Sequence, residues 1–567
     1  MNRPAARSVR QVAALACLLA AAGCLQVQKD LPPRAVAATS DARTGGTVTV
    51  GIAAPTSIDP ALVPPADAAG TLVVHTMCDS LLGTDPVTGD VQPDLASRIL
   101  VGGDGTIVTV RLRRGVRFSD GTTLSAADVV ATLTRLARPE VASPLAPALR
   151  HIYGYQQLQQ DEQKAHGRLA GVSAPDPRTV QIALTTPDAG WVRELTTTVG
   201  TPIPRGHAKD NGFGAFSTQP VCVGPYRLSG PWRPGDSTIT LVRVPGYDGG
   251  NPGDTRAGRG WADRIVFRVY ADQQAAYDAY LRGEVDLAQV PTGVTDVATR
   301  RIGADLVSAP DATLGYLGLP ATVPPFDDPV VRTALSMAID RTAIVHDVYH
   351  DGRLPAQGLY PPVVGDHVWR PDACGAATPS TADVGGARTL LGSRLAALRR
   401  TTWPVYYDDE FANKALVTEL TTQWRHNLGI NVRRLAMNFA GYLPKAMQAP
   451  GFDGPFRLSY ASASSSPSEY VGDLLTAASV DTSNATRFVD RTVEQLFAHE
   501  ATTHYGPRAD AAWHAIEQRF CTQLPLIPLT FNDQVWAWRS SIGAALGHRL
   551  DRATGLPLLR ECYRRVG

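Results

Sequence analysis

The sequence predicts a large α/β protein whose chain crosses between lobes. Residues 105–136 carry a strand pattern followed directly by a helix pattern, so both kinds of element are expected in the fold. The chain has 567 residues, more than one hydrophobic core normally supports, and we therefore expect more than one lobe. No serine- or glycine-rich linker divides residues 45–567, which favours lobes built from interwoven segments.

A strand, a turn and a capped helix are predicted in that order. From Val108 to Leu112, apolar and polar residues alternate with the two-residue period of a half-buried strand. Asp120-Gly121 favours a turn. Ser125 followed by Asp128 predicts a helix start, because the hydroxyl can accept a backbone N–H and the carboxylate lies at the positive end of the helix dipole.

The beginning of the chain predicts a lipoprotein leader. Basic residues precede an apolar run from Val12 to Ala22, which is too short to span a bilayer but matches the core of a signal peptide. The run ends in Ala21-Ala22-Gly23-Cys24, the form of a lipobox. We therefore expect residues 1–23 to be removed and Cys24 to carry lipid.

Residues 24–44 are predicted to be a flexible tether, because they are polar and lack periodicity. No later segment is apolar for long enough to span a membrane. The expected location is the extracytoplasmic face of the cell membrane, with a lipid anchor. An ordinary secretory signal stays open as the alternative, since Ala21 stands where lipoboxes usually carry Leu.

The net charge bears on nucleic-acid binding, and the cysteine content bears on disulfide formation. The net charge of +1 gives no electrostatic basis for binding nucleic acid. Disulfides are expected outside the membrane, and the odd number of cysteines left after Cys17 and Cys24 implies one thiol without an intramolecular partner. The pairing stays open among Cys78, Cys222, Cys374, Cys521 and Cys562.

Catalytic signatures are mostly missing. The sequence contains no G-x-S-x-G elbow, no G-x-x-x-x-G-K-[ST] phosphate loop, and no G-x-G-x-x-G after a strand. His346 and His350 are four residues apart and would share a face of a helix, like the metal ligands of H-E-x-x-H proteases, although Asp347 is shorter than their glutamate base. We favour a solvated helix face and expect no enzyme activity and no cofactor, while a metal site stays open.

Two helix starts are predicted close to these histidines. Asp328 followed by Pro329 is typical of a cap and a first helical position, and Asp340 predicts the cap of the next helix. That second helix would carry the histidines outward.

The amino-acid sequences of several segments resemble those of the family 5 extracellular solute-binding proteins. These proteins are the oligopeptide, dipeptide and nickel receptors of ABC importers. The most specific match is LRRGVRFSDGTTLSAADVV at residues 112–130, which is similar to the family's LRxGVxFxDGxxLxAxDVV. Further similar segments occur at intervals, so the resemblance extends over roughly the whole mature chain. They are Gly45–Gly51, Ser57–Pro60, Val223–Tyr226, Gly283–Leu287, Asp328–Arg341 and Leu524–Leu529.

The resemblance implies a two-lobe α/β fold like that of periplasmic binding proteins, of type II and of the large oligopeptide-receptor form with three subdomains. Lobe 1 would comprise residues 45–85, 205–310 and 520–567. An accessory subdomain, 86–204, would be inserted into lobe 1, and lobe 2 would be 311–519. A solute held between such lobes is largely buried, and closure is what a transporter recognises.

The resemblance also places a ligand site. A unit similar to the family's WKKxLGVNV has a helix carrying Leu416, Leu420 and Trp424, followed by a strand ending at Ile430-Asn431-Val432. The resemblance then implies the ligand-binding positions Phe439, Arg457 and Tyr460, with Pro467 keeping the register.

One implied position departs from the family. Ala463 stands where the family's aspartate holds a peptide's α-ammonium, and losing one partner of a buried charge pair typically costs about 3–5 kcal/mol. Ser462 and its neighbouring serines suit neutral polar groups instead, and Glu469 is the nearest carboxylate that could substitute. If this loop is out of register, its serines are merely solvated, and that alternative stays open.

Aromatic side chains are expected to supply apolar walls, with Arg457 as an anion anchor. The candidates are Tyr406, Tyr407, Phe439, Tyr442 and Tyr460, with Tyr316, Ser57 and Tyr226 as weaker ones.

The function implied is that of an ABC-importer receptor for a peptide-like or other medium-sized polar solute. Its partners would be a membrane permease and an ATPase, since the chain has no nucleotide motif. Two alternatives stay open, a secreted metal-dependent hydrolase built on His346 and His350, and a surface sensor or scaffold with the same fold.

Overall fold

The computed structural model describes residues 42–565, apart from 86–88, 103–104, 161–166, 209–213, 248–259, 365–367, 410–411, 463, 501–506 and 546. The predicted leader, Cys24, most of the tether and Ala463 lie outside the described residues. No helix in the described part of the chain is both long enough and apolar enough to cross a membrane.

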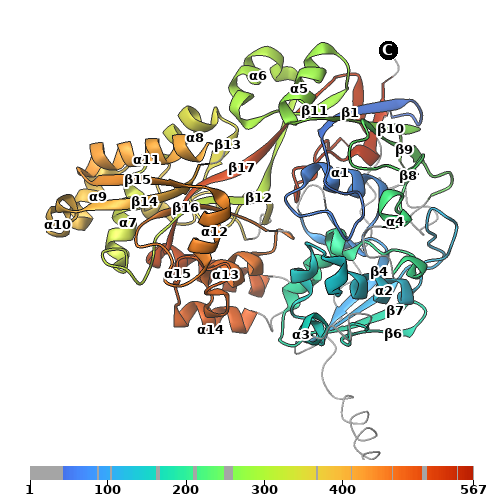
Figure 1. The fold of residues 1–567 in the computed structure, drawn as a ribbon, viewed down its shortest axis with the longest axis horizontal. Coiled ribbons are helices and arrows are strands. Elements are labelled where there is room, and N and C mark those ends of the chain that lie inside the picture. Colours follow the sequence, from blue (N-terminus) through green and yellow to red (C-terminus); the bar gives the residue numbers. More distant parts are fainter. Residues whose placement is uncertain are drawn as a thin grey trace, which may run out of the picture.

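Two lobes share one large sheet, with lobe 2 on the left of Figure 1 and lobe 1 on the right. Within the described residues this sheet has eleven strands. In spatial order they are β15 (Asn431–Met437), β14 (Thr402–Asp408), β16 (Phe456–Ala461), β12 (Leu306–Gly318), β17 (Leu526–Trp538), β11 (Leu287–Gln289), β1 (Thr47–Ala53), β10 (Arg264–Tyr270), β9 (Thr238–Arg243) and β8 (Tyr226–Leu228), with β13 (Arg353–Pro355) pairing with β17.

Strands β12 and β17 connect the two lobes. Each has 13 residues, and they pair in antiparallel fashion along most of their length (Figure 1). Their register shifts between Pro310 and Leu314, where the strands pass from one lobe to the other. Asp311 stabilises this irregular segment, because its carboxylate accepts hydrogen bonds from the Thr313 N–H (2.8 Å) and from the Gln534 side chain (2.7 Å).

Apolar patterning explains the strands. In β1, Val48, Val50 and Ile52 point from one face of the strand into the core of lobe 1, and the intervening Gly51 is buried as well. The first six residues of β17 are all buried, as expected for a central strand covered on both faces. The predicted first strand and the predicted LPLIPL strand are therefore confirmed.

The helices of lobe 1 lie around its half of the sheet (Figure 1). The helix α5 shows how capping residues define the ends of these helices. At the start of α5, the Asp272 side chain accepts a hydrogen bond from the Ala275 N–H. Gly283 ends α5 in the left-handed conformation that favours glycine. The lobe 1 helices are α1 (Ala68–Met77), α4 (Ala215–Thr218), α5 (Gln273–Arg282) and α6 (Thr295–Ile302).

A separate small sheet forms the accessory subdomain below lobe 1 in Figure 1. It contains β4 (Ala96–Val101), β5 (Ile107–Leu112), β7 (Thr179–Ala183) and β6 (Val172–Asp176), covered by α2 (Ala126–Ala137) and flanked by α3 (Tyr155–Gln160). The predicted strand, turn and helix are confirmed: Val108, Val110 and Leu112 are fully buried, and the Ser125 N–H donates to the Asp128 carboxylate at 2.8 Å.

Lobe 2 has a large apolar core between its half of the sheet and many helices. The predicted caps are confirmed, since the Asp328 side chain caps α7 with Pro329 at the first position and Asp340 caps α8. The lobe 2 helices are α7 (Pro329–Met337), α8 (Arg341–Tyr349), α9 (Val384–Leu391), α10 (Arg394–Arg400), α11 (Asn413–Leu428), α12 (Phe439–Met447), α13 (Pro467–Leu475), α14 (Arg491–Glu500) and α15 (Pro507–Gln523).

One predicted boundary is wrong. The strand after α11 begins at Asn431 and does not end at Val432, because Gly429 ends the helix in the left-handed conformation and β15 starts two residues later. Small hairpin-like pairs complete the fold: β2 (Leu82–Thr84) with β3 (Val91–Pro93), and β18 (Ile542–Ala544) with β19 (Cys562–Arg564).

The disulfide pairing, which the sequence leaves open, is resolved in the structure. Cys78 pairs with Cys222 inside the core of lobe 1, and Cys374 pairs with Cys521 in lobe 2. Cys562 is a buried free thiol. Each bridge closes a long stretch of chain, which constrains the unfolded state.

Candidate ligand-binding site

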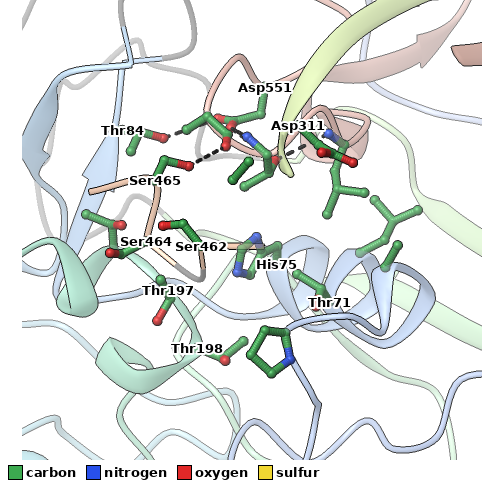
Figure 2. A pocket seen from close by; sticks show the side chains of 18 of the residues that line it. Thr71, His75, Thr84, Thr197, Thr198, Asp311, Ser462, Ser464, Ser465 and Asp551 are labelled. Carbon is green, nitrogen blue, oxygen red and sulfur yellow. Dashed lines mark hydrogen bonds between the residues drawn. The ribbon is translucent and has the colours of Figure 1, made fainter. Parts of the chain in front are cut away.

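A cavity of about 1090 Å³ lies between the two lobes. Its walls come from α1, β2 and the chain near residues 551–561 on one side, and from β16, α12 and the loop after β16 on the other. Asp311, from one of the two connecting strands, lines it as well (Figure 2). Gln534, from the other connecting strand, is also a lining residue. The size of the cavity is at the upper end of small-molecule sites, so it can hold a solute of several linked groups.

Hydroxyl-bearing side chains are the most numerous kind of polar group in the wall. Figure 2 shows Thr71, Thr197 and Ser462 around the same space as His75. Hydroxyls both donate and accept, and therefore suit neutral groups such as amides and alcohols. The hydroxyl-bearing lining residues are Thr71, Thr76, Ser80, Thr84, Thr196, Thr197, Thr198, Tyr247, Thr313, Ser459, Ser462, Ser464, Ser465 and Thr554.

Arg457 brings a buried positive charge to the wall from β16. Only 4% of the residue is exposed, and none of the ion pairs among the described residues includes it. Its guanidinium contacts the Leu458 carbonyl, while its Nε has no hydrogen-bond partner in the described structure. A buried charge without a counter-charge is costly, so this cation fits an anionic group of a ligand.

The position of Arg457 is set by its neighbours. The Tyr442 hydroxyl donates to the Arg457 carbonyl at 2.7 Å, which fixes the strand against α12. Gly315 on the adjacent β12 leaves room for the guanidinium, since a Cβ there would lie 3.4 Å from Nη2 and 2.7 Å from the Thr530 hydroxyl. A larger residue at position 315 would therefore collide first with the Thr530 hydroxyl.

Lobe 1 contributes a network of charged groups opposite Arg457. Asp79 accepts from Arg560 at 2.6 Å. Burial, together with the nearby Asp79 carboxylate, raises the pKa of Asp94 to about 7. Burial and then the charge of Arg560 lower the pKa of His75 to about 4, so this histidine is neutral near pH 7.

The remaining lining aspartates already accept hydrogen bonds from the protein. Asp408 accepts from the Asn413 side chain at 2.9 Å, and Asp551 accepts from the Thr554 N–H at 2.9 Å. Asp311 has the two donors described above.

Glu561 also lines the cavity; neither of its carboxylate oxygens has a hydrogen-bond partner in the described structure, and burial raises its pKa well above the usual range. The cavity therefore offers an uncompensated cation at Arg457, hydrogen-bonded or paired aspartates, and two carboxyl groups, Asp94 and Glu561, whose pKa values are raised by burial.

Three of the predicted site residues line the cavity: Phe439, Arg457 and Ser462. Phe439 is the first residue of α12 and is 43% exposed, an unusual value for a phenylalanine, and it gives the wall an apolar surface. Whether any of these residues contacts a ligand remains a prediction.

Tyr407, Tyr460 and Glu469 are not among the residues that line this cavity. Tyr407 is buried in the lobe 2 core. Tyr460 donates to Asp473 at 2.8 Å and packs edge-on against Tyr470, because it projects from the opposite face of β16 to Arg457. Glu469 lies behind the serine-rich loop and accepts the Ser464 N–H at 3.3 Å.

The other aromatic candidates are largely core residues. Tyr316, Tyr226 and Tyr442 are buried, and the Tyr226 hydroxyl donates to the Ala262 carbonyl at 2.9 Å. Tyr406 stacks on Phe452 within lobe 2. Ser57 accepts the Asp59 N–H at 3.1 Å and thereby shapes the loop after β1.

Sequence reasoning missed the lobe 1 wall, including Thr71, His75, Asp94, Thr197 and Asp551. These residues come from segments far apart in the chain, and none belongs to a local pattern that indicates binding. Asp311 is a charged residue next to a proline inside the long strand β12, and no sequence pattern that we considered predicted it as a site residue.

The two histidines do not share a helical face. Helix α8 ends at Tyr349, and His350 adopts the left-handed conformation beyond it, whereas His346 points into solvent beside Asp351 at 3.3 Å. Among the residues that the structure describes, no group of three or more His, Cys, Asp or Glu side chains could hold a metal ion. The geometry of an H-E-x-x-H site is therefore not reproduced here.

Residues 90–480 match the bacterial extracellular solute-binding proteins, family 5 (Middle). The match covers well over half of the chain. The chain belongs to this family. The predicted two-lobe α/β fold is confirmed as well.

Curated relatives of this chain include an oligopeptide-binding and a glutathione-binding protein. The periplasmic oligopeptide-binding protein OppA of Escherichia coli (strain K12) is 25% identical over 389 residues, which are 67% of this chain and 69% of OppA. The glutathione-binding protein GsiB of the same strain is 29% identical over 308 residues. That match covers 53% of this chain and about half of GsiB, 54%.

Solved structures share the fold over nearly the whole length. The unliganded open form of the periplasmic murein tripeptide binding protein MppA has a TM-score of 0.76 at 20% identity, covering 93% of this chain and 99% of MppA. The clavulanic acid biosynthesis oligopeptide binding protein 2 has a TM-score of 0.78 at 19% identity, covering 94% and 99%. At this identity the likeness establishes the fold alone.

Proposed function

We propose that this protein is the substrate-binding lipoprotein of an ABC importer. It would capture a peptide-like or other medium-sized polar solute between its lobes and deliver it to a membrane permease powered by a partner ATPase. The observation that carries this function is the large inter-lobe cavity, which combines a hydroxyl-rich wall with the unpaired buried cation of Arg457. Membership of the family and the receptors among its relatives support the proposal.

Closure would occur about the connecting strands. We propose that lobe 1 with its accessory subdomain and lobe 2 move as units, that the chain returns to lobe 1 within β17, and that the register shift near Asp311 is the hinge. Asp311 lines the cavity and also bonds Gln534 across the two strands, so a ligand contacting it would act directly on the hinge.

Peptide titration with matched amine chemistry tests this function. Asp79, Asp408 and Asp551 are already hydrogen-bonded or paired, and burial raises the pKa values of Asp94 and Glu561, so a free N-terminus should gain little. An N-acetylated tripeptide should bind within about threefold of its free-amine twin, a difference of less than about 0.7 kcal/mol. Calorimetry measures the affinities, and small-angle scattering should show a smaller radius of gyration with bound peptide.

Stoichiometric binding without turnover would support the receptor function. Chelator-sensitive hydrolysis of the peptide would overturn it in favour of the hydrolase alternative. A strong preference for the free amine would leave the receptor function intact but show that a carboxylate of the cavity anchors the ammonium. The variant Ala463→Asp provides the positive control for such an anchor, and it should introduce a preference for the free amine.

Lipid anchoring is a separate prediction. The variant Cys24→Ser should move the protein from the membrane fraction to the soluble fraction, because a thiol is needed to carry the lipid and no described helix could span the membrane. Fractionation followed by immunoblotting measures the distribution, with Cys17→Ser as the matched control that should stay in the membrane fraction. Retention of the Cys24→Ser protein in the membrane would contradict the assignment.

A further inference from the structure

The accessory subdomain touches lobe 2 at a small surface, which we call the rim contact and define by Arg150, Gly190, Ser466, Ser468 and Asp473. A guanidinium nitrogen of Arg150 lies 3.3 Å from the Asp473 carboxylate. A Cβ at Gly190 would lie 3.2 Å from the Ser468 hydroxyl and 3.6 Å from the Ser466 hydroxyl, so the accessory backbone comes directly against the start of α13. Figure 1 shows α13 on the side of lobe 2 nearest the accessory subdomain, below the connecting strands.

The accessory half of the rim contact is held by the core of its own subdomain. Trp191, next to Gly190, is only 4% exposed, and its ring N–H donates to the Ala148 carbonyl at 2.8 Å. This bond joins the 3-10 helix that carries Gly190 to the short helix that ends at Arg150. Gly190 and Arg150 are therefore presented together on one fixed surface.

The lobe 2 half of the contact is fixed in the same way. The Tyr460 hydroxyl donates to the Asp473 carboxylate at 2.8 Å, and the hydroxyls of Ser466 and Ser468 are hydrogen-bonded to each other at 2.7 Å. Tyr470, on the same helix, is buried in the lobe 2 core. Both surfaces are thus formed within their own lobes, which lowers the entropic cost of bringing them together.

On both sides, the chain runs from the rim contact directly into the cavity wall. In the accessory subdomain, residues 196–198 line the cavity and follow the helix turn that begins at Gly190. In lobe 2, Ser465 lines the cavity and directly precedes Ser466. None of the five residues of the rim contact lines the cavity itself. Since Asp311 of the connecting strands is a lining residue too, the cavity extends from those strands to the rim contact.

We propose that the accessory subdomain is a clasp for the ligand cavity: the rim contact closes the cavity on the side away from the connecting strands, solute enters or leaves only when this contact parts, and Gly190 is the positioning residue that lets the two surfaces meet. The proposal rests on the proposed receptor function for the solute alone, because the closing of the rim can be tested without one.

The steric fit at Gly190 should matter more than the ion pair. The side chains of Arg150 and Asp473 are 48% and 22% exposed, and pairs with this exposure to solvent usually contribute little. The close approach of the accessory backbone to Ser468, in contrast, is possible only because residue 190 has no side chain.

A disulfide across the rim tests the contact in the full mature chain without any solute. In Gly190→Cys/Ser468→Cys, the Cβ of residue 190 would lie 3.2 Å from the present position of the Ser468 Oγ, which fits the Cβ–Cβ distance of about 3.5–4.5 Å in disulfides. We expect mild oxidation to join residues 190 and 468, and peptide mapping distinguishes this bond from the native bridges. The control Gly190→Cys/Thr401→Cys should form none, since Thr401 is exposed after α10, at the far end of lobe 2 (Figure 1).

Passage of solute through the rim is measured on the same crosslinked protein. Stopped-flow mixing with the N-acetylated tripeptide should show association at least about tenfold slower than after reduction of the crosslink, and tripeptide trapped during oxidation should leave correspondingly slowly. Reduction should restore both rates. Wild-type protein taken through the same oxidation and reduction is the control and should keep its rates throughout.

The variant Gly190→Leu tests the clasp by bulk instead of by a bond. Its side chain would occupy space next to the Ser468 hydroxyl, so the empty protein should have a larger radius of gyration than wild type and should release the tripeptide faster. The matched control is Gly206→Leu on the 3-10 helix Arg205–His207, where a Cβ would meet no atom within 4 Å, and it should change neither quantity. Because a Cβ at Gly190 would also lie 3.3 Å from Asp188, circular dichroism should verify that Gly190→Leu is folded.

Two results would overturn the clasp: no bond between residues 190 and 468 under oxidation, or a crosslinked protein that takes up the tripeptide as fast as its reduced form. A reduced protein that binds no tripeptide would instead contradict the receptor function. In that case the crosslinking yield and the radius of gyration of Gly190→Leu still decide whether the rim closes.

Discussion

Replacing Arg457 with alanine should weaken the binding of a peptide with a free C-terminal carboxylate by about 2–5 kcal/mol, on the order of 30- to 4000-fold in Kd. The reason is the burial of this cation in the wall of the cavity without a carboxylate partner among the described residues. An anionic group of the ligand would compensate a charge that the protein leaves uncompensated. Calorimetric titration of the peptide and of its C-terminal amide separates this charge effect from general contact.

The same substitution should not destabilise the empty protein through charge, because it removes a cation that lacks a counter-charge. Arg457→Lys should retain part of the affinity, although a lysine cannot make the bidentate contact of a guanidinium. Arg433→Ala, which replaces an exposed arginine on the edge strand β15, is the matched control and should leave the affinity unchanged. Equal losses for the carboxylate and the amide peptide would show that Arg457 does not anchor an anion.

Replacing Asp59 with alanine should lower the free energy of unfolding by about 3–5 kcal/mol. Arg135 and Asp59 form a two-pronged ion pair at 2.8 and 2.6 Å, and both side chains are essentially inaccessible to solvent. The pair joins the loop after β1 to α2 of the accessory subdomain. Without Asp59, the guanidinium of Arg135 remains buried without its counter-charge.

Urea unfolding of wild type, Asp59→Ala and the double variant Asp59→Leu/Arg135→Met measures this effect. The double variant should recover much of the stability, since apolar replacement of both partners avoids burying either charge. Glu284→Ala, which removes the exposed partner of Arg282, is the control and should change stability little. A double variant as unstable as Asp59→Ala would show that lost packing, and not the orphaned charge, is responsible.

Local structure in this protein could be predicted because the relevant signals are local. The alternation from Val108 to Leu112, the capping pair Ser125 and Asp128, and the caps at Asp328 and Asp340 all act within a few residues, and the structure confirms each. The error at Val432 arose because the strand and the glycine that ends the helix are adjacent, which is where boundaries are least certain from sequence.

The site was harder to predict, since sheet geometry and distant segments decide it. Arg457 and Tyr460 are three residues apart on β16, and an odd separation places them on opposite faces, so only Arg457 reaches the cavity. His75 and Asp551 join the wall from positions far apart in the chain. No pattern within one segment could have brought them together.

The connecting strands also determine the order in which the two lobes can fold. Lobe 2 lies almost entirely between β12 and β17, and the ends of this excursion meet where the Leu319 N–H donates to the Pro525 carbonyl at 3.1 Å. The sheet of lobe 1, in contrast, needs β17 beside β11, a strand from the last tenth of the sequence. During synthesis from the N-terminus, much of lobe 2 can therefore fold before the residues that complete the sheet of lobe 1 have been made. Truncation of the C-terminus should consequently damage lobe 1 most, although lobe 1 contains the beginning of the chain.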